Sequence, residues 1–155
     1  MTGGARLPLV LLHGWGFDAS TWAPMRAHLD GWEIHADDAG YFGRAVAARR
    51  PPAYVAVGHS LGAMRGLEEA GGGCRGLVLI NGFARFSATA DFPQGVAPRV
   101  LDRMLTRLAA DPAAVVGEFR RRCGAEEPVD AGALDGDALA AGLRHLREGD
   151  ARAAW

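Results

Sequence analysis

Gly58 to Gly62 carry the clearest chemical signal in the sequence. They read Gly-His-Ser-Leu-Gly, directly after the apolar run Tyr54 to Val57 and before a helical pattern. A serine on a tight turn from strand to helix presents its hydroxyl as a nucleophile, and flanking glycines let the backbone pass close to neighbouring elements. The free amides at the start of the new helix lie where negative charge develops during acyl transfer. We therefore predict that Ser60 is a catalytic nucleophile.

A second glycine-rich turn, His13 to Gly16, follows the first apolar run of the chain. A loop at this position beside a nucleophile offers a backbone amide to an oxyanion, and one such donor contributes about 3 kcal/mol to transition-state stabilisation. We assign this donor to Trp15 and the second donor to Leu61, the residue after the nucleophile. Together the two motifs predict an oxyanion hole beside Ser60.

Short apolar runs supply the sheet that must position these two turns. Four of them alternate with helical patterns: Leu7 to Leu12, Trp32 to Ala36, Tyr54 to Val57 and Leu77 to Ile80. After the first run, Asp18 or Ser20 can cap a helix whose apolar positions are Trp22, Met25 and Leu29. This alternation is typical of an α/β fold, in which helices cover both faces of a mostly parallel sheet.

Helices replace strands after Asn81. Their apolar positions are Leu101, Met104, Leu105 and Leu108 in the first helix, Val115, Val116, Phe119 and Cys123 in the second, and Leu139, Leu143 and Leu146 in the third. Asp111 followed by Pro112 marks the start of the second helix, because aspartate caps free amides and proline fits the first turn. The stretch Gly124 to Gly136 is expected to be a loop. These helices are expected to form a separate layer.

The composition limits the possible functions. The chain has 155 residues, 49% of them hydrophobic and 23% charged, which suits one globular domain. Its 17 basic side chains, all arginine, nearly balance 18 acidic ones, and this balance argues against nucleic-acid binding. The longest apolar run, Leu7 to Leu12, is far below the roughly 20 residues of a membrane span. We therefore expect a cytoplasmic protein without membrane contact.

Neither the cysteines nor the motifs indicate a metal or a cofactor. Cys74 and Cys123 stand alone, outside any paired motif, so we predict neither a disulfide framework nor a zinc site. The serine chemistry predicted above needs no metal and no organic cofactor.

Three stretches of the sequence resemble a known family. They are LVLLHGWGFDASTW at Leu9 to Trp22, GHSLGA at Gly58 to Ala63 and LVLINGFARFSATADFPQGV at Leu77 to Val96, with weaker similarity through Arg99 to Phe119 and Ala140 to Arg152. The chain looks like an α/β-hydrolase and specifically resembles the pimeloyl-[acyl-carrier protein] methyl ester carboxylesterases of biotin biosynthesis. The resemblance implies an α/β-hydrolase core over residues 1–82, a helical cap over 83–148, and the start of a return to the core over 149–155. It also implies that the C-terminal strands of the fold are absent.

The resemblance implies a serine carboxylesterase whose cap closes over an acyl chain. Carried over by position, Ser60 is the nucleophile, Trp15 and Leu61 give the oxyanion amides and contact the substrate, and Phe119 to Cys123 form part of the substrate wall. Phe119 has an equal alternative as a core residue of its helix, because an aromatic on an apolar stripe usually serves packing. An Arg-rich cap surface would attract an acidic acyl carrier protein, with an ordinary solvated helix face as the alternative; its members are Arg99, Arg103, Arg107, Arg120, Arg121 and Arg122.

The serine also needs a base and an acid, which in this fold follow the nucleophile in the order Asp or Glu, then His. In the family they lie beyond the cap, and this sequence ends at Trp155. His13 and His59 belong to the two motifs, where local geometry directs them away from the serine hydroxyl, while His28 and His35 belong to an early helix and strand. Only His145 has acids before it in the required order, namely Asp130, Asp135 and Asp137, and it falls within a leucine-marked helix. We therefore expect a nucleophile and oxyanion hole without a base, and weak activity of this chain.

Two alternatives stay open beside hydrolysis of a pimeloyl-carrier methyl ester. One is another small-ester hydrolase of the same fold, because the serine motif does not fix the acyl group. The other is a non-catalytic acyl-carrier-binding protein. In each case the strand Leu77 to Ile80 is expected to be an exposed apolar edge, which predicts pairing into a homodimer.

Overall fold

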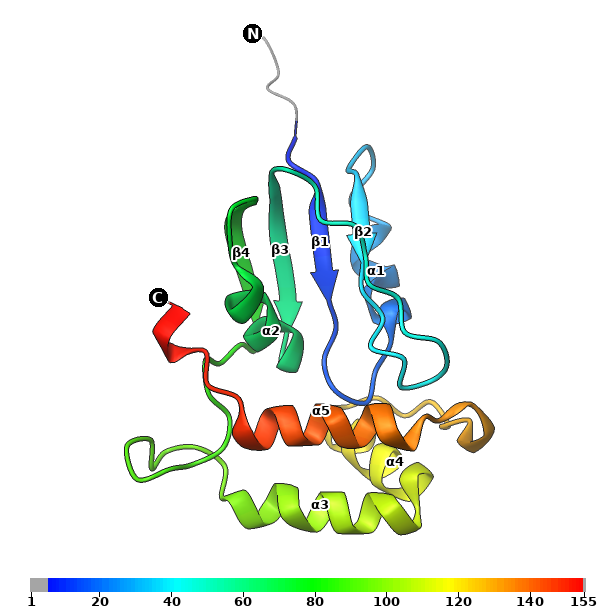
Figure 1. The fold of residues 1–155 in the computed structure, drawn as a ribbon. Coiled ribbons are helices and arrows are strands. Elements are labelled where there is room, and N and C mark those ends of the chain that lie inside the picture. Colours follow the sequence, from blue (N-terminus) through cyan, green and yellow to red (C-terminus); the bar gives the residue numbers. More distant parts are fainter. Residues whose placement is uncertain (1–5, 155) are drawn as a thin grey trace, which may run out of the picture.

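The computed structural model describes residues 6–154 and contains a parallel sheet with a layer of helices at one end (Figure 1). The strands are β1 (Leu9–Leu12), β2 (Ile34–Ala36), β3 (Tyr54–His59) and β4 (Cys74–Ile80). Their order in the sheet is β2-β1-β3-β4, and each neighbouring pair is parallel. Each predicted strand is confirmed, with ends that differ by a few residues. The predicted α/β class is also confirmed.

The helices occupy two kinds of position. They are α1 (Ala23–Arg26), α2 (Leu61–Glu69), α3 (Pro98–Ala110), α4 (Pro112–Arg122) and α5 (Gly136–Glu148), with short 3-10 turns at Ala19–Trp22, Ala131–Ala133 and Arg152–Ala154. Figure 1 shows α1 and α2 beside the sheet and α3, α4 and α5 across the carboxyl ends of its strands. The separate helical layer is therefore as predicted.

Side chains of β1 alternate between the two faces of the sheet. Leu9 and Leu11 pack with Trp22 on the α1 side, while Val10 packs with Tyr54 on the other side. Both faces of β1 are buried, which explains its unbroken apolar sequence. The predicted helix around Trp22 is shorter than expected and splits into a 3-10 turn and the four residues of α1.

β4 is an edge strand with one uncovered side. Val78 aligns with Val57 of β3 and therefore points to the α1 side, where it is 48% exposed; Ile80 is 39% exposed. Leu77 and Leu79 point to the other side and pack against the main core. The predicted exposed apolar edge is thus present in the monomer.

Aspartate side chains cap the N-termini of two helices in the second layer, α4 and α5. Asp111 accepts a hydrogen bond from the Ala114 amide at 2.9 Å, and Asp135 accepts one from the Ala138 amide at 2.9 Å. Pro112 occupies the first position of α4. The helix start predicted at Asp111 is confirmed, and the loop predicted to Gly136 ends one residue earlier, because Gly136 already belongs to α5.

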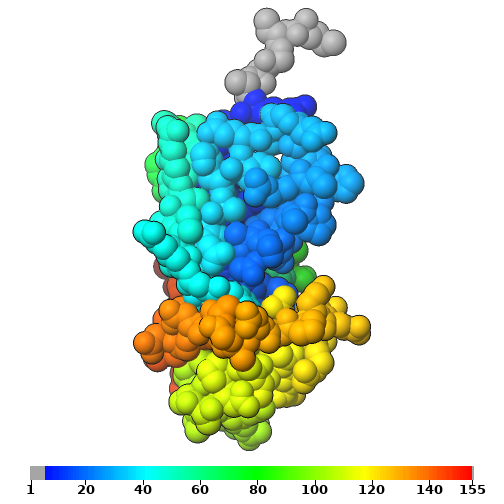
Figure 2. Space-filling view, turned by 90° about the vertical axis from the view of Figure 1, so that its right-hand side faces the viewer, coloured from blue at the N-terminus to red at the C-terminus, as the bar shows by residue number. Residues whose placement is uncertain are grey.

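The two layers share one hydrophobic core. Figure 2 shows them as two tiers, with the segment before and within α5 running across the junction. Trp15 is 1% exposed and packs in the same cluster as Leu139 and Leu143 of α5. Its indole Nε1 also donates to the Leu139 carbonyl at 2.8 Å. Within residues 6–154, no helix has the length and apolar character that crossing a membrane requires.

Candidate active site

Ser60 occupies a strained turn between β3 and α2. Its backbone angles are φ 54° and ψ −118°, a conformation that side chains other than glycine rarely adopt. The turn is held from both sides, since the Ser60 amide donates to the Ile80 carbonyl at 3.0 Å and the Ser60 carbonyl accepts from the Ala63 amide at 2.9 Å. Strain of this kind persists only where the surrounding structure maintains it.

The glycines around Ser60 are required by close packing. A Cβ at Gly58 would lie 2.5 Å from the Ala63 Cα, and a Cβ at Gly62 would overlap the Leu12 carbonyl oxygen. A Cβ at Gly14 would lie 3.3 Å from the Ser60 Cβ. The turn after β1 therefore presses directly against the serine, as an oxyanion loop must.

The two amides assigned to the oxyanion hole are unpartnered. Within the described part of the chain, neither the Trp15 amide nor the Leu61 amide has a hydrogen-bond acceptor. Leu61 is the first residue of α2, where an amide has no partner inside its own helix. Trp15 is 1% and Leu61 2% exposed, so both donors sit in buried residues. Buried amides are nearly always paired, and unpaired ones are costly.

A cavity of about 580 Å³ brings most of the predicted residues together. Ser60, Trp15, Phe119 and Cys123 all line it, whereas Leu61 is 2% exposed and lines a separate hollow. The Phe119 ring packs edge-on against the Trp15 ring, with centroids 4.9 Å apart. Phe119 therefore packs on the core and also lines the cavity, and neither of the two roles that the sequence left open is excluded by its position.

Other cavity residues were not predicted from the sequence; they include Phe17, Thr21, Asn81 and Glu127. Asn81 directly follows β4 and has φ 47°. Apart from glycine, only Ser60 and Asn81 have positive φ among the residues that the structure describes. The position of Asn81 in the sequence could have predicted its place at the cavity, because it follows the strand next to that of Ser60. Residues at the carboxyl ends of neighbouring parallel strands meet at the same edge of the sheet.

His13 does not serve as a base, because both of its ring nitrogens are engaged. Nδ1 lies 2.8 Å from the Gly14 carbonyl oxygen, and Nε2 accepts from the Ala39 amide at 2.9 Å. His59 does line the cavity beside Ser60. Burial, and to a lesser degree the charge of His13, lowers the pKa of His59. Of the residues described, no cavity-lining histidine is paired with a carboxylate.

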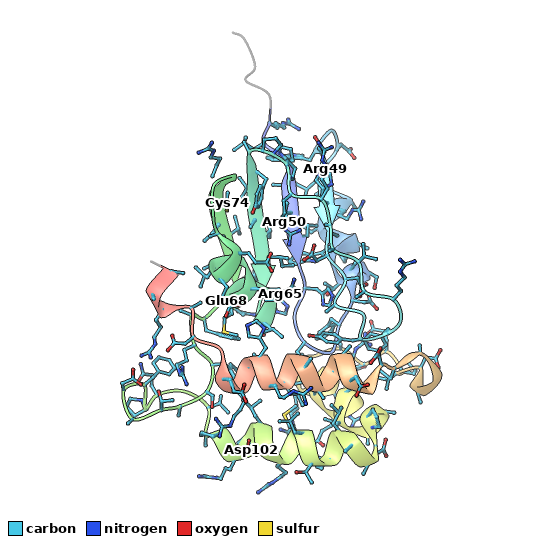
Figure 3. All side chains as sticks on the ribbon, viewed as in Figure 1. Arg49, Arg50, Arg65, Glu68, Cys74 and Asp102 are labelled. Atoms are coloured by element: carbon cyan, nitrogen blue, oxygen red, sulfur yellow. The ribbon has the colours of Figure 1, made fainter. Side chains whose placement is uncertain are left out.

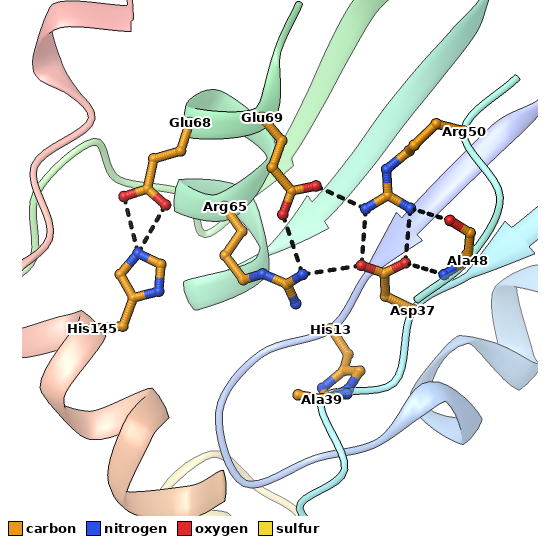
Figure 4. A network of polar contacts seen from close by, with 9 residues as sticks. All are labelled: His13, Asp37, Ala39, Ala48, Arg50, Arg65, Glu68, Glu69 and His145. Carbon is orange, nitrogen blue, oxygen red and sulfur yellow. Dashed lines mark hydrogen bonds and ion pairs between the residues drawn. The ribbon is translucent and has the colours of Figure 1, made fainter. Parts of the chain in front are cut away.

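His145 lies outside this cavity. Its Nε2 is 2.8 Å from Glu68 Oε2 on α2, and it lines a separate hollow that includes Arg65 and Tyr41. Figure 3 labels Glu68 beside α2, and Figure 4 shows its contact with His145. Two of the acids before His145 have structural roles, since Asp130 and Asp135 accept hydrogen bonds from backbone amides. The structure thus pairs His145 with Glu68 and does not bring it to Ser60.

Four of the six arginines predicted for the cap surface fall into two groups, and the other two, Arg99 and Arg121, are exposed outside both. Arg103, Arg107 and Arg122 line a groove between α3 and α4, where Glu118 contacts Arg107 at 2.8 Å and Arg122 at 2.6 Å. The hydrogen bond from Arg107 lowers the pKa of Glu118. Arg120 lies elsewhere, with its guanidinium 5.1 Å from the Phe17 ring centroid and 5.4 Å from that of Phe42.

Comparison with known proteins identifies relatives of this chain. No family model matches it. It is 30% identical to a pimeloyl-[acyl-carrier protein] methyl ester esterase of Stenotrophomonas maltophilia, in a match that covers 94% of this chain and 68% of the relative. It is 31% identical to the enzyme of that name from Sodalis glossinidius, over 76% of this chain and 52% of the relative. A biotin biosynthesis bifunctional protein of Cellvibrio japonicus is 32% identical, over 72% of this chain and 26% of its own length.

Solved structures agree on the fold. An esterase from Exiguobacterium antarcticum superposes with a TM-score of 0.77 at 17% identity, covering 97% of this chain and 69% of that one. An enol-lactonase from Burkholderia xenovorans superposes with a TM-score of 0.69 at 18% identity, covering 99% of this chain and 70% of that one. The chain spans 68% and 52% of the length of the two pimeloyl-[acyl-carrier protein] methyl ester esterases named above. It belongs to the pimeloyl-[acyl-carrier protein] methyl ester esterase family, within the α/β-hydrolases.

Proposed function

We propose that this chain provides the nucleophile and the oxyanion hole of a serine carboxylesterase. One observation carries the proposal: Ser60 has a strained backbone and lines one cavity with Trp15, and the amides of Trp15 and of Leu61, the next residue after Ser60, have no acceptor among the described residues. Backbone strain and unpaired amides are both costly to a fold that does not use them. Ser60 is the nucleophile, and Trp15 and Leu61 are the oxyanion donors.

The reaction then follows the general course of acyl transfer. The Ser60 Oγ bonds to the ester carbonyl carbon and its proton passes to a base, while the carbonyl oxygen takes negative charge and accepts from the two amides. Collapse of the tetrahedral intermediate breaks the ester bond and releases the alcohol with a proton. Water then cleaves the acyl-serine to the free acid. The relatives are longer than this chain, and we assign the base and its acid to that additional length.

The substrate that we propose is the methyl ester of a pimeloyl group on acyl carrier protein, after the names of the relatives. Residues 1–82 would then form the hydrolase core, 83–148 a cap over the acyl chain, and 149–155 the return to the core. Phe119 and Cys123 would contact the acyl chain from the cap side. The cavity has room for such a chain, since pockets for small ligands are typically 300–1,000 Å³.

An acidic carrier protein would approach the groove between α3 and α4. The groove is lined by the apolar side chains of Val100, Met104 and Val115 and by Arg103, Arg107 and Arg122, whose three positive charges exceed the single negative charge of Glu118 between them. Opposite charge across an interface mainly accelerates association, and the effect falls as salt increases. Arg120 is not part of this surface in our proposal, because it contacts aromatic rings elsewhere.

We also propose that two copies of the chain associate through β4. Its unpaired edge, together with the exposed side chains of Val78 and Ile80, is the kind of surface that pairs with a second strand. Light scattering should give about twice the monomer mass, and Val78→Lys should shift it toward the monomer. A stable wild-type monomer at high concentration would contradict this part of the proposal.

A non-catalytic, carrier-binding role is the second candidate. It is favoured by the lack, among residues 6–154, of a carboxylate-paired histidine at the Ser60 cavity. A fluorophosphonate probe separates the two candidates. Labelling that is lost in Ser60→Ala supports the esterase, and hydrolysis of p-nitrophenyl esters would show turnover; folded protein that resists labelling supports the binding role.

A further inference from the structure

We propose that His13 is a positioning residue that fixes the direction of the Trp15 amide, and thereby half of the oxyanion hole. This inference rests on the proposed function, because it assigns the Trp15 amide to the developing oxyanion. His13 is buried and does not line the Ser60 cavity. Its effect on the reaction must therefore act through the backbone.

The hydrogen bonds of His13 determine its tautomer. A backbone amide can only donate, so the bond from the Ala39 amide requires an unprotonated Nε2. In a neutral imidazole the proton then sits on Nδ1, which donates to the Gly14 carbonyl at 2.8 Å. The ring is thus a directed link that accepts from Ala39 at one end and donates to Gly14 at the other.

Peptide geometry carries this link to the oxyanion hole. The Gly14 carbonyl and the Trp15 amide belong to one peptide unit, and in a planar trans peptide they point in opposite directions. Holding the carbonyl toward His13 therefore holds the N–H on the other side. Without this bond the unit can rotate more easily, because glycine tolerates a wide range of backbone angles. A stiffer residue at Gly14 would be crowded, since a Cβ there would lie 3.1 Å from His59 Nδ1 and 3.3 Å from the His59 carbonyl oxygen.

The Ala39 end of the link is itself anchored. Ala39 lies in the segment that follows β2, and the buried Asp37 at its start accepts from the Ala48 amide at 2.8 Å, from Arg50 at 2.8 and 2.9 Å, and from Arg65 at 3.0 Å. Figure 4 shows this cluster beside the His13–Ala39 contact. Burial acts to raise the pKa of Asp37, but hydrogen bonds and nearby arginines outweigh it and leave the pKa below its ordinary value. Asp37 therefore stays ionised and holds the segment.

A pair of variants separates the two ends of the link. In His13→Asn, the carboxamide N–H takes the place of Nδ1 and can still donate to Gly14, but nothing accepts from Ala39. In His13→Gln, the carboxamide oxygen takes the place of Nε2 and can still accept from Ala39, but the Gly14 carbonyl loses its donor. Both variants remove the same ring, including its edge-on contact with Tyr41, so a purely structural role predicts similar effects.

The experiment measures the rate of fluorophosphonate labelling at Ser60 together with the thermal midpoint of each variant. We expect His13→Gln to label about 10- to 100-fold more slowly, below the roughly 100- to 1,000-fold that follows removal of an oxyanion donor because the Trp15 amide is misdirected and not removed, and His13→Asn to stay within about threefold of wild type. Both midpoints should fall by similar amounts. His35→Gln, at a partly buried histidine that is paired with Glu33, is the matched control and should leave the rate unchanged. Equal slowing in both His13 variants, or none in His13→Gln, would overturn the inference.

A second readout keeps the test independent of the proposed function. In amide NMR spectra, His13→Gln should shift the Trp15 resonance and speed its hydrogen exchange, while His13→Asn should leave both close to wild type. If the wild type resists labelling but the Trp15 amide responds in this way, the proposed esterase fails and the positioning role holds. If the Trp15 amide responds equally to both variants, the positioning role fails.

Discussion

Ser60 and His145 both lie near the junction of the sheet and the helical layer, but their surroundings differ. Ser60 has a left-handed backbone, glycine neighbours that cannot carry a Cβ, and unpartnered amides beside it. His145 projects from a regular helix and contacts Glu68, with side chains 34% and 29% exposed. The first arrangement exists only because its surroundings enforce it, whereas the second is an ion pair that proteins gain and lose at little cost. This difference is why we place the chemistry at Ser60.

Gly62→Ala should have the largest effect. The new Cβ would overlap the Leu12 carbonyl oxygen, which belongs to β1 backbone and cannot move aside. We expect a loss of about 3 kcal/mol or more in the free energy of unfolding, together with loss of Ser60 labelling. Gly136→Ala is the matched control, because nothing lies within 4 Å of its Cβ position and alanine favours the helix. Urea unfolding measures the stability of the two variants. A Gly62→Ala protein of wild-type stability would refute the packing argument.

Asp37→Asn should come second. Removing the charge leaves Arg50 and Arg65 beside a neutral group. We expect the free energy of unfolding to fall by about 2 kcal/mol. This is less than for a fully buried pair, because the Arg50 side chain is 31% exposed. Since the pKa of Asp37 is lowered in the folded state, its contribution is complete above the ordinary value near 3.8 and disappears as pH falls through the folded pKa. Thermal midpoints from pH 7 to pH 2 should therefore fall less steeply in Asp37→Asn. Parallel curves would show that Asp37 is not the responsive group.

Ser60→Gly should have a smaller and opposite effect on stability. Glycine adopts φ 54° without the penalty that a side chain carries, so we expect a gain of about 1 kcal/mol while labelling disappears. Thermal unfolding and mass spectrometry of the probe-treated protein test the two parts. A destabilised glycine variant would mean that the turn is not strained in solution.

His145→Gln should have the smallest effect. The pair with Glu68 is partly exposed, so its loss should change the free energy of unfolding by at most about 1 kcal/mol and leave the rate of Ser60 labelling unchanged. The measurement is a time course of labelling with the fluorophosphonate probe. A strong decrease in rate at wild-type stability would instead assign His145 to the serine as its base.

The features that could be predicted from the sequence are those that local patterns determine, namely the strands, a helix start and the turn at Ser60. Short apolar runs located the strands, and the Asp111-Pro112 pair located the start of α4, because these signals act within a few residues. The glycine spacing around Ser60 identified the turn for the same reason. The sequence did not predict that Asn81 and Glu127 share the cavity, that Arg120 contacts two phenylalanine rings, or that His13 links Gly14 to Ala39. Each of these depends on contacts between segments that are distant in the chain.

A crystal structure of the protein after reaction with a fluorophosphonate would test directly whether Ser60 is the nucleophile beside two oxyanion donors. We expect phosphorus bonded to the Ser60 Oγ, with the phosphoryl oxygen about 2.7–3.1 Å from the amide nitrogens of both Trp15 and Leu61. A phosphoryl oxygen that points to solvent, or a label on another residue, would contradict this assignment.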